Sequence, residues 1–328
     1  MKSIAAIHRS YGKPNEVVRA ETVDVPEPQK GQAVVKLLRA VVNPSDLGMI
    51  GGSYGRLRPL PAIAGREGVG EVVALGGGGT ESPKIGSRVK LPPEPGAWTQ
   101  YQVCDAAELV QIPDGLPLDT CAMAFVNPPT ALCILDNFEK LGEGDWFIQN
   151  GAGSALGYFA IQMCRARGIK TVNMLRNAAA KRADLEAIGA DIVVDEAEFD
   201  AKKIKELTGG KLKLGLNQIG GASVSNMIKA MGDSATVVTI GGMVGDPVRF
   251  PTRFLIFNDL TLRGFWWDKW QRTHSKAEVD AVYAKIFGMI KDGTLKAPVD
   301  SVFKIADIQN ALARAMENSR SGKVMIEF

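Results

Sequence analysis

The chain has 328 residues, which exceeds the usual length of one domain and favours two. Apolar residues make up 45% and charged residues 23% of it, which argues against disorder, and the net charge of +3 is spread along the chain, which argues against a nucleic-acid partner. There is no CxxC pair and no apolar run long enough to span a bilayer, so we expect no disulfides, no metal knot and no membrane association. These features favour a cytoplasmic protein, or a mitochondrial one if a presequence has been removed.

Residues 1–120 have the pattern of short strands separated by glycine and proline. The stretches at residues 32–42 and 68–76 are examples, because apolar and β-branched residues lie there between turn residues. This pattern predicts a mixed, β-rich domain.

From about residue 121, strands and helices alternate. Predicted strands lie at residues 145–150, 170–176, 191–195, 212–219 and 235–242, and predicted helices lie at residues 155–168 and 178–190 and between the last two strands. Alternation at this spacing predicts an α/β fold in which crossover helices cover a parallel, doubly wound sheet of the Rossmann type. We therefore predict a dinucleotide-binding domain over residues 121–269.

The remaining residues read as two helices and a final apolar segment. The helices are predicted at residues 275–293 and 306–318, and the segment at residues 323–328. We expect this part to return to the first domain. The predicted organisation is thus a catalytic domain of residues 1–120 with 270–328, and a dinucleotide-binding domain of residues 121–269.

Gly151, Gly153 and Gly157 form a GxGxxxG turn between a predicted buried strand and a predicted helix. A pyrophosphate site needs small residues there, because backbone N–H groups must approach the phosphate oxygens and the helix N-terminus adds positive potential. The strand–turn–helix context therefore indicates such a site. The alternative is that the glycines only permit close packing of the helix on the strand.

The end of the second predicted strand indicates which dinucleotide is bound. Asn173, Arg176 and Asn177 lie where a site that prefers NAD would have an acidic residue for the ribose hydroxyls. A guanidinium can bind a 2′-phosphate through two parallel hydrogen bonds, whereas a carboxylate would repel it. NADPH is therefore favoured, and the alternative is that Arg176 is an ordinary charge at the end of a strand.

Four stretches together resemble the medium-chain dehydrogenase/reductase superfamily: "AGREGVGEVVALG" (64–76), "GSRV" (86–89), "NPPTAL" (127–132) and the glycine turn. The resemblance implies a GroES-like catalytic domain beside the Rossmann-type domain. In the zinc enzymes of this superfamily, a cysteine and the histidine of a GHE sequence hold the metal. Here residues 43–46 supply no cysteine, and Arg66 stands before Glu67 in the histidine's place. We therefore expect the zinc-independent branch, no metal, and a structural Glu67 paired with Arg66 or a nearby loop amide.

Further stretches resemble the mitochondrial-type trans-2-enoyl-thioester reductases and occur in that family's order. They are residues 43–55, 126–150, 216–221, 240–243, 254–270 and 321–324, so the resemblance runs through almost the whole chain. It implies an enzyme of fatty acid metabolism that uses NADPH to reduce the α,β double bond of an enoyl thioester. The acyl carrier would be coenzyme A or an acyl carrier protein.

The resemblance also assigns roles to single residues. Tyr54 becomes the catalytic proton donor. The residues expected at the cofactor, together with Asn173 from the argument above, are Asn127, Gly153, Ser154, Ala155, Leu156, Arg176, Asn177, Ala178, Ile240, Gly241, Gly242, Met243, Phe265, Trp266, Trp267 and Lys323. The family commonly shows Arg-Asp-Arg at residues 176–178, so one basic contact is missing here, and Arg182 is a candidate to replace it.

A tyrosine suits this chemistry. The reaction needs hydride at the β carbon and a proton at the α carbon, and a phenol of pKa about 10 stays protonated near neutral pH yet can protonate a strongly basic enolate. The glycines around Tyr54 let the loop approach a substrate, and Asn43 is expected to orient the hydroxyl or the thioester oxygen. The alternative is that Tyr54 only packs a glycine-rich loop.

Two other groups have both a functional and an ordinary interpretation. Arg56 and Arg58 could receive the phosphates of the carrier or an acidic partner helix, or they could be exposed arginines of no special role. Trp266, Trp267 and Trp270 could line the acyl pocket or close a hydrophobic core.

Three questions stay open at this point. Residues 259–267 could pair across a two-fold axis, so we expect a homodimer. A zinc-independent quinone or enone oxidoreductase of the same superfamily is the nearest rival function. A non-catalytic module that binds NADPH is a rival of another class.

Overall fold

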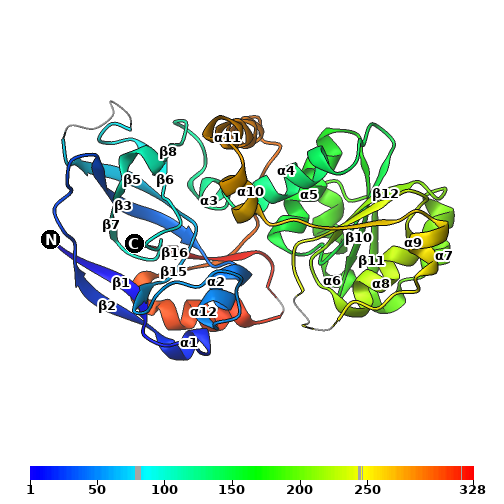
Figure 1. Cartoon of the computed structure of the whole chain (residues 1–328), viewed down its shortest axis with the longest axis horizontal. Coiled ribbons are helices and arrows are strands. Elements are labelled where there is room, and N and C mark those ends of the chain that lie inside the picture. Colours follow the sequence, from blue (N-terminus) through cyan, green and yellow to red (C-terminus); the bar gives the residue numbers. More distant parts are fainter. Residues whose placement is uncertain (78–82, 243–244, 246, 319) are drawn as a thin grey trace. The chain divides into compact units, whose positions relative to one another are not determined.

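The computed structural model of the chain describes residues 1–77, 83–242, 245, 247–318 and 320–328 (Figure 1). These residues form two compact units. Unit 1 comprises Met1–Phe125 with Ala297–Phe328, and unit 2 comprises Val126–Lys296. Within the described residues, no helix combines the length and the apolar character that a membrane span requires.

The boundary between the units differs from the one predicted at residue 270. Residues 270–296 belong to unit 2 because helix α11 (Lys276–Lys291) packs against helix α4 (Asn127–Asn137). An ion pair of 3.4 Å between Lys285 and Asp136 joins the same two helices. The chain therefore returns to unit 1 only at Ala297.

Unit 1 is β-rich, as predicted. Its strands are β1 (Lys2–His8), β2 (Val18–Asp24), β3 (Gln32–Val41), β4 (Ala62–Ile63), β5 (Gly68–Leu75), β6 (Arg88–Lys90), β7 (Tyr101–Asp105), β8 (Val110–Gln111), β15 (Val299–Lys304) and β16 (Lys323–Glu327). Its helices are α1 (Pro14–Val17), α2 (Pro44–Ile50), α3 (Leu118–Ala122) and α12 (Ile308–Met316). One sheet has the order β2-β1-β4, and the other has the order β15-β16-β3-β5-β6-β8, with β7 on β3. Since β16 pairs with β3, the predicted return of the last segment is confirmed.

The core of unit 1 packs around Trp98, which is fully buried. Its indole N–H donates a hydrogen bond to the carbonyl oxygen of Val41 at 3.1 Å. Gly65 lies against the indole ring, with a φ of +84° and space for no side chain, because a Cβ there would lie 2.2 Å from Trp98. This contact fixes the backbone directly before Arg66 and Glu67.

The described residues of unit 2 form one parallel sheet of six strands. They are β9 (Trp146–Asn150), β10 (Lys170–Leu175), β11 (Ile192–Asp195), β12 (Leu212–Asn217), β13 (Thr236–Thr239) and β14 (Thr261–Gly264), in the order β11-β10-β9-β12-β13-β14. Besides α4 and α11, the helices are α5 (Ala155–Ala166), α6 (Ala178–Ala187), α7 (Ala201–Leu207), α8 (Gly221–Ala230), α9 (Arg253–Phe257) and α10 (Trp267–Thr273). These strands and helices run from green to orange in Figure 1.

Helices cover both faces of this sheet. On one face, Tyr158 and Ile161 of α5 and Leu185 of α6 pack against Leu175 and Val193. On the other face, Ile204, Val224, Met227 and Ile228 of α7 and α8 pack against Ile148, Val172 and Met174. The predicted doubly wound α/β fold is therefore confirmed. The chain order reverses between β9 and β12, and sheets of this kind bind ligands outside the carboxyl ends of the strands at such a point.

All four cysteines are buried free thiols. Burial raises the pKa of the Cys121 thiol to about 11, and the pKa values of Cys104 and Cys133 to about 12. The pKa of the Cys164 thiol is raised for the same reason. At neutral pH only a very small fraction of each of these cysteines is in the reactive thiolate form.

Candidate active site

The turn between β9 and α5 is closed by glycines and capped by Ser154. Gly151 has a φ of +62°, which favours glycine, and at Gly157 a Cβ would lie 2.4 Å from the carbonyl oxygen of Ala152. The Oγ of Ser154 accepts a hydrogen bond of 3.0 Å from the N–H of Gly157. The first N–H groups of a helix have no partners within it and carry partial positive charge, so this turn suits a phosphate.

Buried amide side chains support this turn, and the sequence reasoning missed them. The Nδ2 of Asn150 donates to the Oδ1 of Asn217 at 2.9 Å, and its Oδ1 accepts from the N–H of Gln218 at 2.7 Å. Gln218 donates to the carbonyl oxygen of Asn150 at 2.9 Å and accepts from the Ser154 hydroxyl at 2.8 Å. The network therefore ties the turn to the ends of β9 and β12. The available signal was a polar residue at the end of each apolar strand.

Asn173 does not lie where a ribose could reach it. It is fully buried inside β10, and its Oδ1 accepts a 2.9 Å hydrogen bond from Gln149. Its Nδ2 donates to Thr171 and to the carbonyl oxygen of Ile192. The prediction of Asn173 as a cofactor contact is therefore corrected, because its side chain faces helices α5 and α6 and is used within the sheet.

Arg176 and Asn177 do lie at the carboxyl end of β10, and both are exposed. Asn177 has a φ of 55°, a left-handed conformation that asparagine tolerates, and α6 begins directly after it. The N–H of Ala178 donates to the Oδ2 of Asp195 at 2.9 Å. Arg182 on the next turn forms a 3.6 Å ion pair with Glu186.

Residues 240–242 follow β13 at the same edge of the sheet. The N–H of Ile240 donates to the carbonyl oxygen of Asn217 at 3.0 Å, and a Cβ on Gly241 would lie 2.9 Å from the carbonyl oxygen of Gln218. The segment thus lies close against the end of β12. Met243, which was predicted beside them, lies outside the described residues.

The aromatic segment after β14 divides into two parts. Phe265 is half-buried and meets the ring of Phe138 edge-on, with a centroid distance of 6.0 Å. Trp267, in contrast, is 4% exposed and stacks on Trp270 at 5.0 Å. The Trp267 ring therefore packs within unit 2, and its contact with the cofactor stays a prediction. Trp266 remains half-buried.

Most of the predicted cofactor residues therefore share one edge of one sheet. Residues 153–156, 176–178, 240–242 and 265–266 follow the carboxyl ends of β9, β10, β13 and β14, which run parallel. Asn127 begins helix α4 and is half-buried.

In unit 1, Tyr54 follows helix α2 in a well-anchored segment. The N–H of Gly12 donates to the carbonyl oxygen of Ile50 at 3.1 Å, and that of Ser53 donates to Gly48 at 2.9 Å. The phenol ring is half-buried, and the guanidinium carbon of Arg66 lies 5.4 Å from its centroid. The Tyr54 ring is thus partly accessible and lies next to a positive charge.

Arg58 is structural. It is 5% exposed, its Nε donates to Glu94 at 2.6 Å, and its other donors bind the backbone carbonyl oxygens of Ile63, Gly65 and Pro93. These contacts correct the prediction that Arg58 receives a carrier phosphate, because the guanidinium is committed inside unit 1. Arg56 is exposed.

Asn43 lies in a buried polar cluster with Glu67 and Lys323. Its Nδ2 donates to the Oε2 of Glu67 at 2.7 Å, and its Oδ1 accepts a hydrogen bond from the Nζ of Lys323. The Oε1 of Glu67 accepts from the N–H of Phe125 at 2.8 Å, so the predicted pairing of Glu67 with a loop amide is confirmed. Burial raises the pKa of the Glu67 carboxyl and lowers the pKa of the Lys323 ammonium, because it disfavours the charged form of each. The Lys323 ammonium thus donates a hydrogen bond to Asn43, and its contact with the cofactor stays a prediction.

The residues at this place do not fit a zinc ion. The positions that correspond to the zinc ligands hold Asn43–Asp46 and Arg66, and the nearby Lys323 and Arg66 are themselves cations. In the part of the chain that the structure describes, no group of three or more histidine, cysteine, aspartate or glutamate side chains could hold a metal ion.

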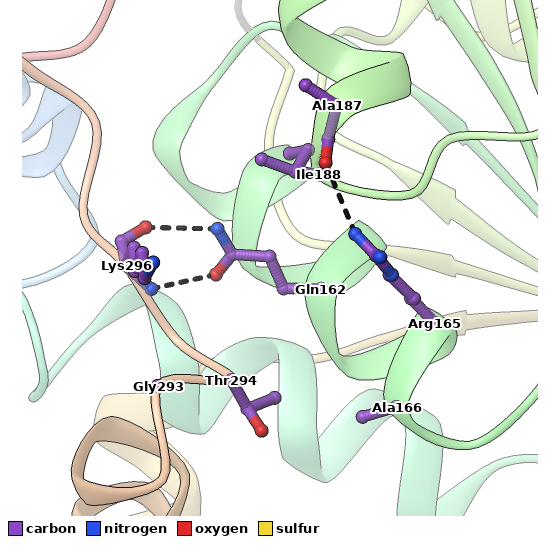
Figure 2. Close-up of a pocket in the computed structure, with 8 residues that line it drawn as sticks. All are labelled: Gln162, Arg165, Ala166, Ala187, Ile188, Gly293, Thr294 and Lys296. Atoms are coloured by element: carbon purple, nitrogen blue, oxygen red, sulfur yellow. Dashed lines mark hydrogen bonds between the residues drawn. The ribbon is translucent and has the colours of Figure 1, made fainter.

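Unit 2 also contains a surface pocket of about 440 Å³, shown in Figure 2. Its lining residues are Gln162, Arg165, Ala166, Ala187, Ile188, Gly293, Thr294 and Lys296. Arg165 donates to the carbonyl oxygen of Ala187 at 3.2 Å, and the side-chain amide of Gln162 bonds the backbone of Lys296. The pocket lies at the C-terminal ends of α5 and α6, about 15 Å along α5 from the glycine turn. It is therefore separate from the cofactor edge.

Comparison with known proteins identifies the class. The alcohol dehydrogenase GroES-like domain matches residues 29–114, and the zinc-binding dehydrogenase domain matches residues 155–285. The chain thus has the two domains of the medium-chain dehydrogenase/reductase superfamily. The mitochondrial enoyl-[acyl-carrier-protein] reductase of Arabidopsis thaliana is 36% identical over 332 residues, which cover 99% of this chain and 88% of that protein. The chain belongs to the family of mitochondrial-type enoyl-[acyl-carrier-protein] reductases, which confirms the predicted resemblance.

Solved structures agree with this assignment. The structure of the Etr1p complex with NADP and crotonyl-CoA has a TM-score of 0.90 and 25% identity, with 100% of both chains covered. A putative NADPH:quinone reductase from Bacillus thuringiensis has a TM-score of 0.91 at 24% identity, over 100% of this chain and 99% of that one, and supports the fold alone.

Proposed function

We propose that this chain reduces the α,β double bond of trans-2-enoyl thioesters with NADPH. The observation that carries the proposal is the half-buried Tyr54 beside Arg66, in a chain that is an enoyl reductase by family over almost its whole length. The solved Etr1p complex, which contains NADP and crotonyl-CoA, supports the cofactor and the substrate class.

In this mechanism Tyr54 protonates the α carbon. NADPH, when bound, supplies the hydride to the β carbon. Loss of the proton leaves a phenolate, and the guanidinium of Arg66 stabilises that charge because it lies 5.4 Å from the ring centroid. The phenol is partly exposed, so it can regain a proton from solvent.

We assign the cofactor to the carboxyl edge of the unit 2 sheet. The turn at residues 153–156 would bind the pyrophosphate, and Arg176 would bind the 2′-phosphate with Asn177 and Ala178 beside it. Residues 240–242, Phe265, Trp266 and Asn127 would contact the rest of the dinucleotide. The glycine geometry at Gly157 and the Ser154 cap support the first of these assignments.

The carrier of the acyl group is proposed to be coenzyme A or an acyl carrier protein. The names of the relatives support the protein carrier, and the Etr1p complex supports coenzyme A. Arg56, exposed near Tyr54, is the arginine that we propose for contact with either carrier.

We also propose a homodimer formed through strand β14. This strand ends the sheet, all four of its residues are exposed, and Ile256 and Phe257 nearby are 69% and 79% exposed. An exposed edge strand beside apolar side chains favours pairing with a second copy. Light scattering should give twice the chain mass for the wild type and a lower mass for Phe257→Ser; monomeric wild type would contradict this proposal.

The test of the function is NADPH oxidation with a medium-chain trans-2-enoyl-CoA, run in parallel with a quinone and with NADH. Fast reduction of the enoyl-CoA that prefers NADPH is expected. Turnover of the quinone alone would favour the quinone oxidoreductase. Tight NADPH binding without oxidation on any substrate would favour the non-catalytic module.

We propose that the protein is located in the cytoplasm. The name of the Arabidopsis thaliana relative places that protein in mitochondria. Fractionation of cells of the source organism would decide between the two compartments.

A further inference from the structure

We propose that Glu67 and Lys323 form a buried charge clamp on the side-chain amide of Asn43, and that this clamp positions the Tyr54 segment for proton transfer. The inference rests on the proposed function of Tyr54. Glu67 and Lys323 are thus positioning residues, which act through Asn43 and helix α2.

In the clamp, two oppositely charged side chains form hydrogen bonds with the same side-chain amide. Asn43 donates from Nδ2 to the Glu67 carboxylate at 2.7 Å and accepts at Oδ1 from the Lys323 ammonium. Hydrogen bonds to charged groups are the stronger ones, and this pair allows one orientation of the amide. All three side chains are buried, with exposures of 2%, 0% and 5%.

Asn43 is the capping residue directly before helix α2, so a restraint on its position also acts on the helix and on Tyr54 beyond it. Its N–H donates to Asp46 at 2.7 Å, and its carbonyl oxygen accepts from the N–H groups of Asp46 and Leu47 at 3.0 and 3.3 Å. Helix α2 ends at Ile50, and the Tyr54 segment follows directly. A shift of Asn43 would therefore move the phenol.

The clamp joins segments that are distant in sequence. Asn43 follows β3, Glu67 precedes β5, Phe125 ends the first part of unit 1, and Lys323 begins β16. Burying ionised groups in this way costs stability unless each is paired, and the sheet alone does not require it. This argues for a role beyond holding β3, β5 and β16 together.

The ionised form of Glu67 is the one that suits the geometry, because both of its carboxyl oxygens accept hydrogen bonds, from Asn43 and from Phe125. The raised pKa of Glu67 and the lowered pKa of Lys323 bring both titrations towards neutrality. Among the other charged groups, Asp46 on α2 acts on both Glu67 and Lys323, and Arg320 ahead of β16 acts on Lys323. Arg58 and Arg66, on either side of β4, act on Asp46.

The test measures kcat against pH for the wild type, Glu67→Gln and the double variant Glu67→Gln/Lys323→Met. Wild-type kcat should rise with pH as Glu67 loses its proton and fall again as Lys323 does. Glu67→Gln should lose the acidic limb and turn over about tenfold more slowly at its best pH. The double variant removes both charges, so it should be more stable than Glu67→Gln but equally slow. A wild-type profile in either variant would overturn the proposal.

Hydrogen exchange provides a readout that does not depend on turnover. Amides at residues 45–54 should exchange faster in Glu67→Gln than in the wild type, while those at residues 151–157 in unit 2 should not change. If the wild type fails to reduce enoyl thioesters, the proposed function fails and this measurement still decides the clamp. Unchanged exchange at residues 45–54 would overturn the proposed clamp.

Discussion

The two segments at the centre of the proposed chemistry are supported by different kinds of side chain. In unit 2, the glycine turn rests on the neutral amides of Asn150, Asn217 and Gln218. In unit 1, Asn43, which directly precedes helix α2 and the Tyr54 segment, is held by the ionisable groups of Glu67 and Lys323. Neutral amides hold one geometry at all physiological pH values, whereas buried charges do not. Cofactor binding should therefore be insensitive to pH near neutrality, and proton transfer should be sensitive to it.

The largest effect is expected for Tyr54→Phe. If the phenol had no chemical role, the substitution would leave turnover unchanged, and the contrast between cofactor binding in unit 2 and proton transfer in unit 1 would not hold. Loss of a general acid typically costs about 100-fold or more in rate, so kcat should fall by at least about 100-fold while NADPH affinity stays unchanged. The control is Tyr11→Phe, which loses a 2.9 Å hydrogen bond to the carbonyl oxygen of Arg58 and should keep most of its kcat. Wild-type turnover by Tyr54→Phe would remove Tyr54 from the mechanism.

Gly157→Ala tests the glycine turn of unit 2, which neutral amide side chains support. The added Cβ would lie 2.4 Å from the Ala152 carbonyl oxygen, which is backbone and cannot rotate away. We expect a loss of about 2–3 kcal/mol in unfolding free energy and much weaker NADPH binding, measured by urea unfolding and fluorescence titration. In the matched control, Gly288→Ala, the Cβ would meet nothing within 4 Å, so stability should rise by up to about 1 kcal/mol. Equal effects of the two substitutions would contradict the packing argument.

Arg176→Ala sharpens the assignment of the cofactor edge. Hydrogen bonds to charged groups contribute about 1.5–3 kcal/mol, so the KM for NADPH should rise about tenfold or more while the KM for NADH should not change. Arg182→Ala, on the next helix turn, is the control and should have a small effect, because Arg182 is paired with Glu186. A larger effect at Arg182 would move the 2′-phosphate to that residue.

Asp300→Asn tests the electrostatics of unit 1 away from Tyr54. Hydrogen bonds from Arg314, at 2.7 and 2.9 Å, lower the pKa of Asp300 to about 2. A lowered carboxyl pKa stabilises the fold above the unfolded-state pKa, and this stability is lost as pH falls from about 4 through about 2. The variant should lose about 1–2 kcal/mol at neutral pH and progressively less below pH 4 or so, as measured by urea unfolding.

The exposed pair of Lys2 and Asp24 provides the control for that measurement. Both side chains are largely in solvent, at 70% and 80% exposure, so Asp24→Asn should not change stability measurably at any pH. A loss as large as that of Asp300→Asn would indicate that the pH dependence arises from net charge and not from the Arg314 contact.

The fold was predictable from the sequence because its signals are local. The alternation of apolar strands and amphipathic helices predicted the sheet of unit 2, and the glycines of residues 151–157 marked the turn after β9. The division of the structure after Lys296 could not be predicted, because α11 has an ordinary amphipathic pattern, which does not reveal that α4 is its partner.

The sequence could not predict which polar side chains face inwards. Asn173 lies within β10 and Arg176 directly follows that strand, yet the first side chain is buried and the second is exposed. Arg58 and Arg56 differ in the same way, because Arg58 finds three carbonyl oxygens and a carboxylate inside unit 1. Lys323 and Glu67 both reach Asn43 because β16 and β5 pair with β3, and that pairing joins segments distant in the sequence.

The buried thiols have a practical consequence for spectroscopy. Since all four cysteines are buried and protonated near neutral pH, a cysteine introduced on an exposed loop would be the most reactive thiol of the molecule. A fluorophore could then be attached at one chosen position without first removing the native cysteines, and the motion of a loop could be followed during single turnovers.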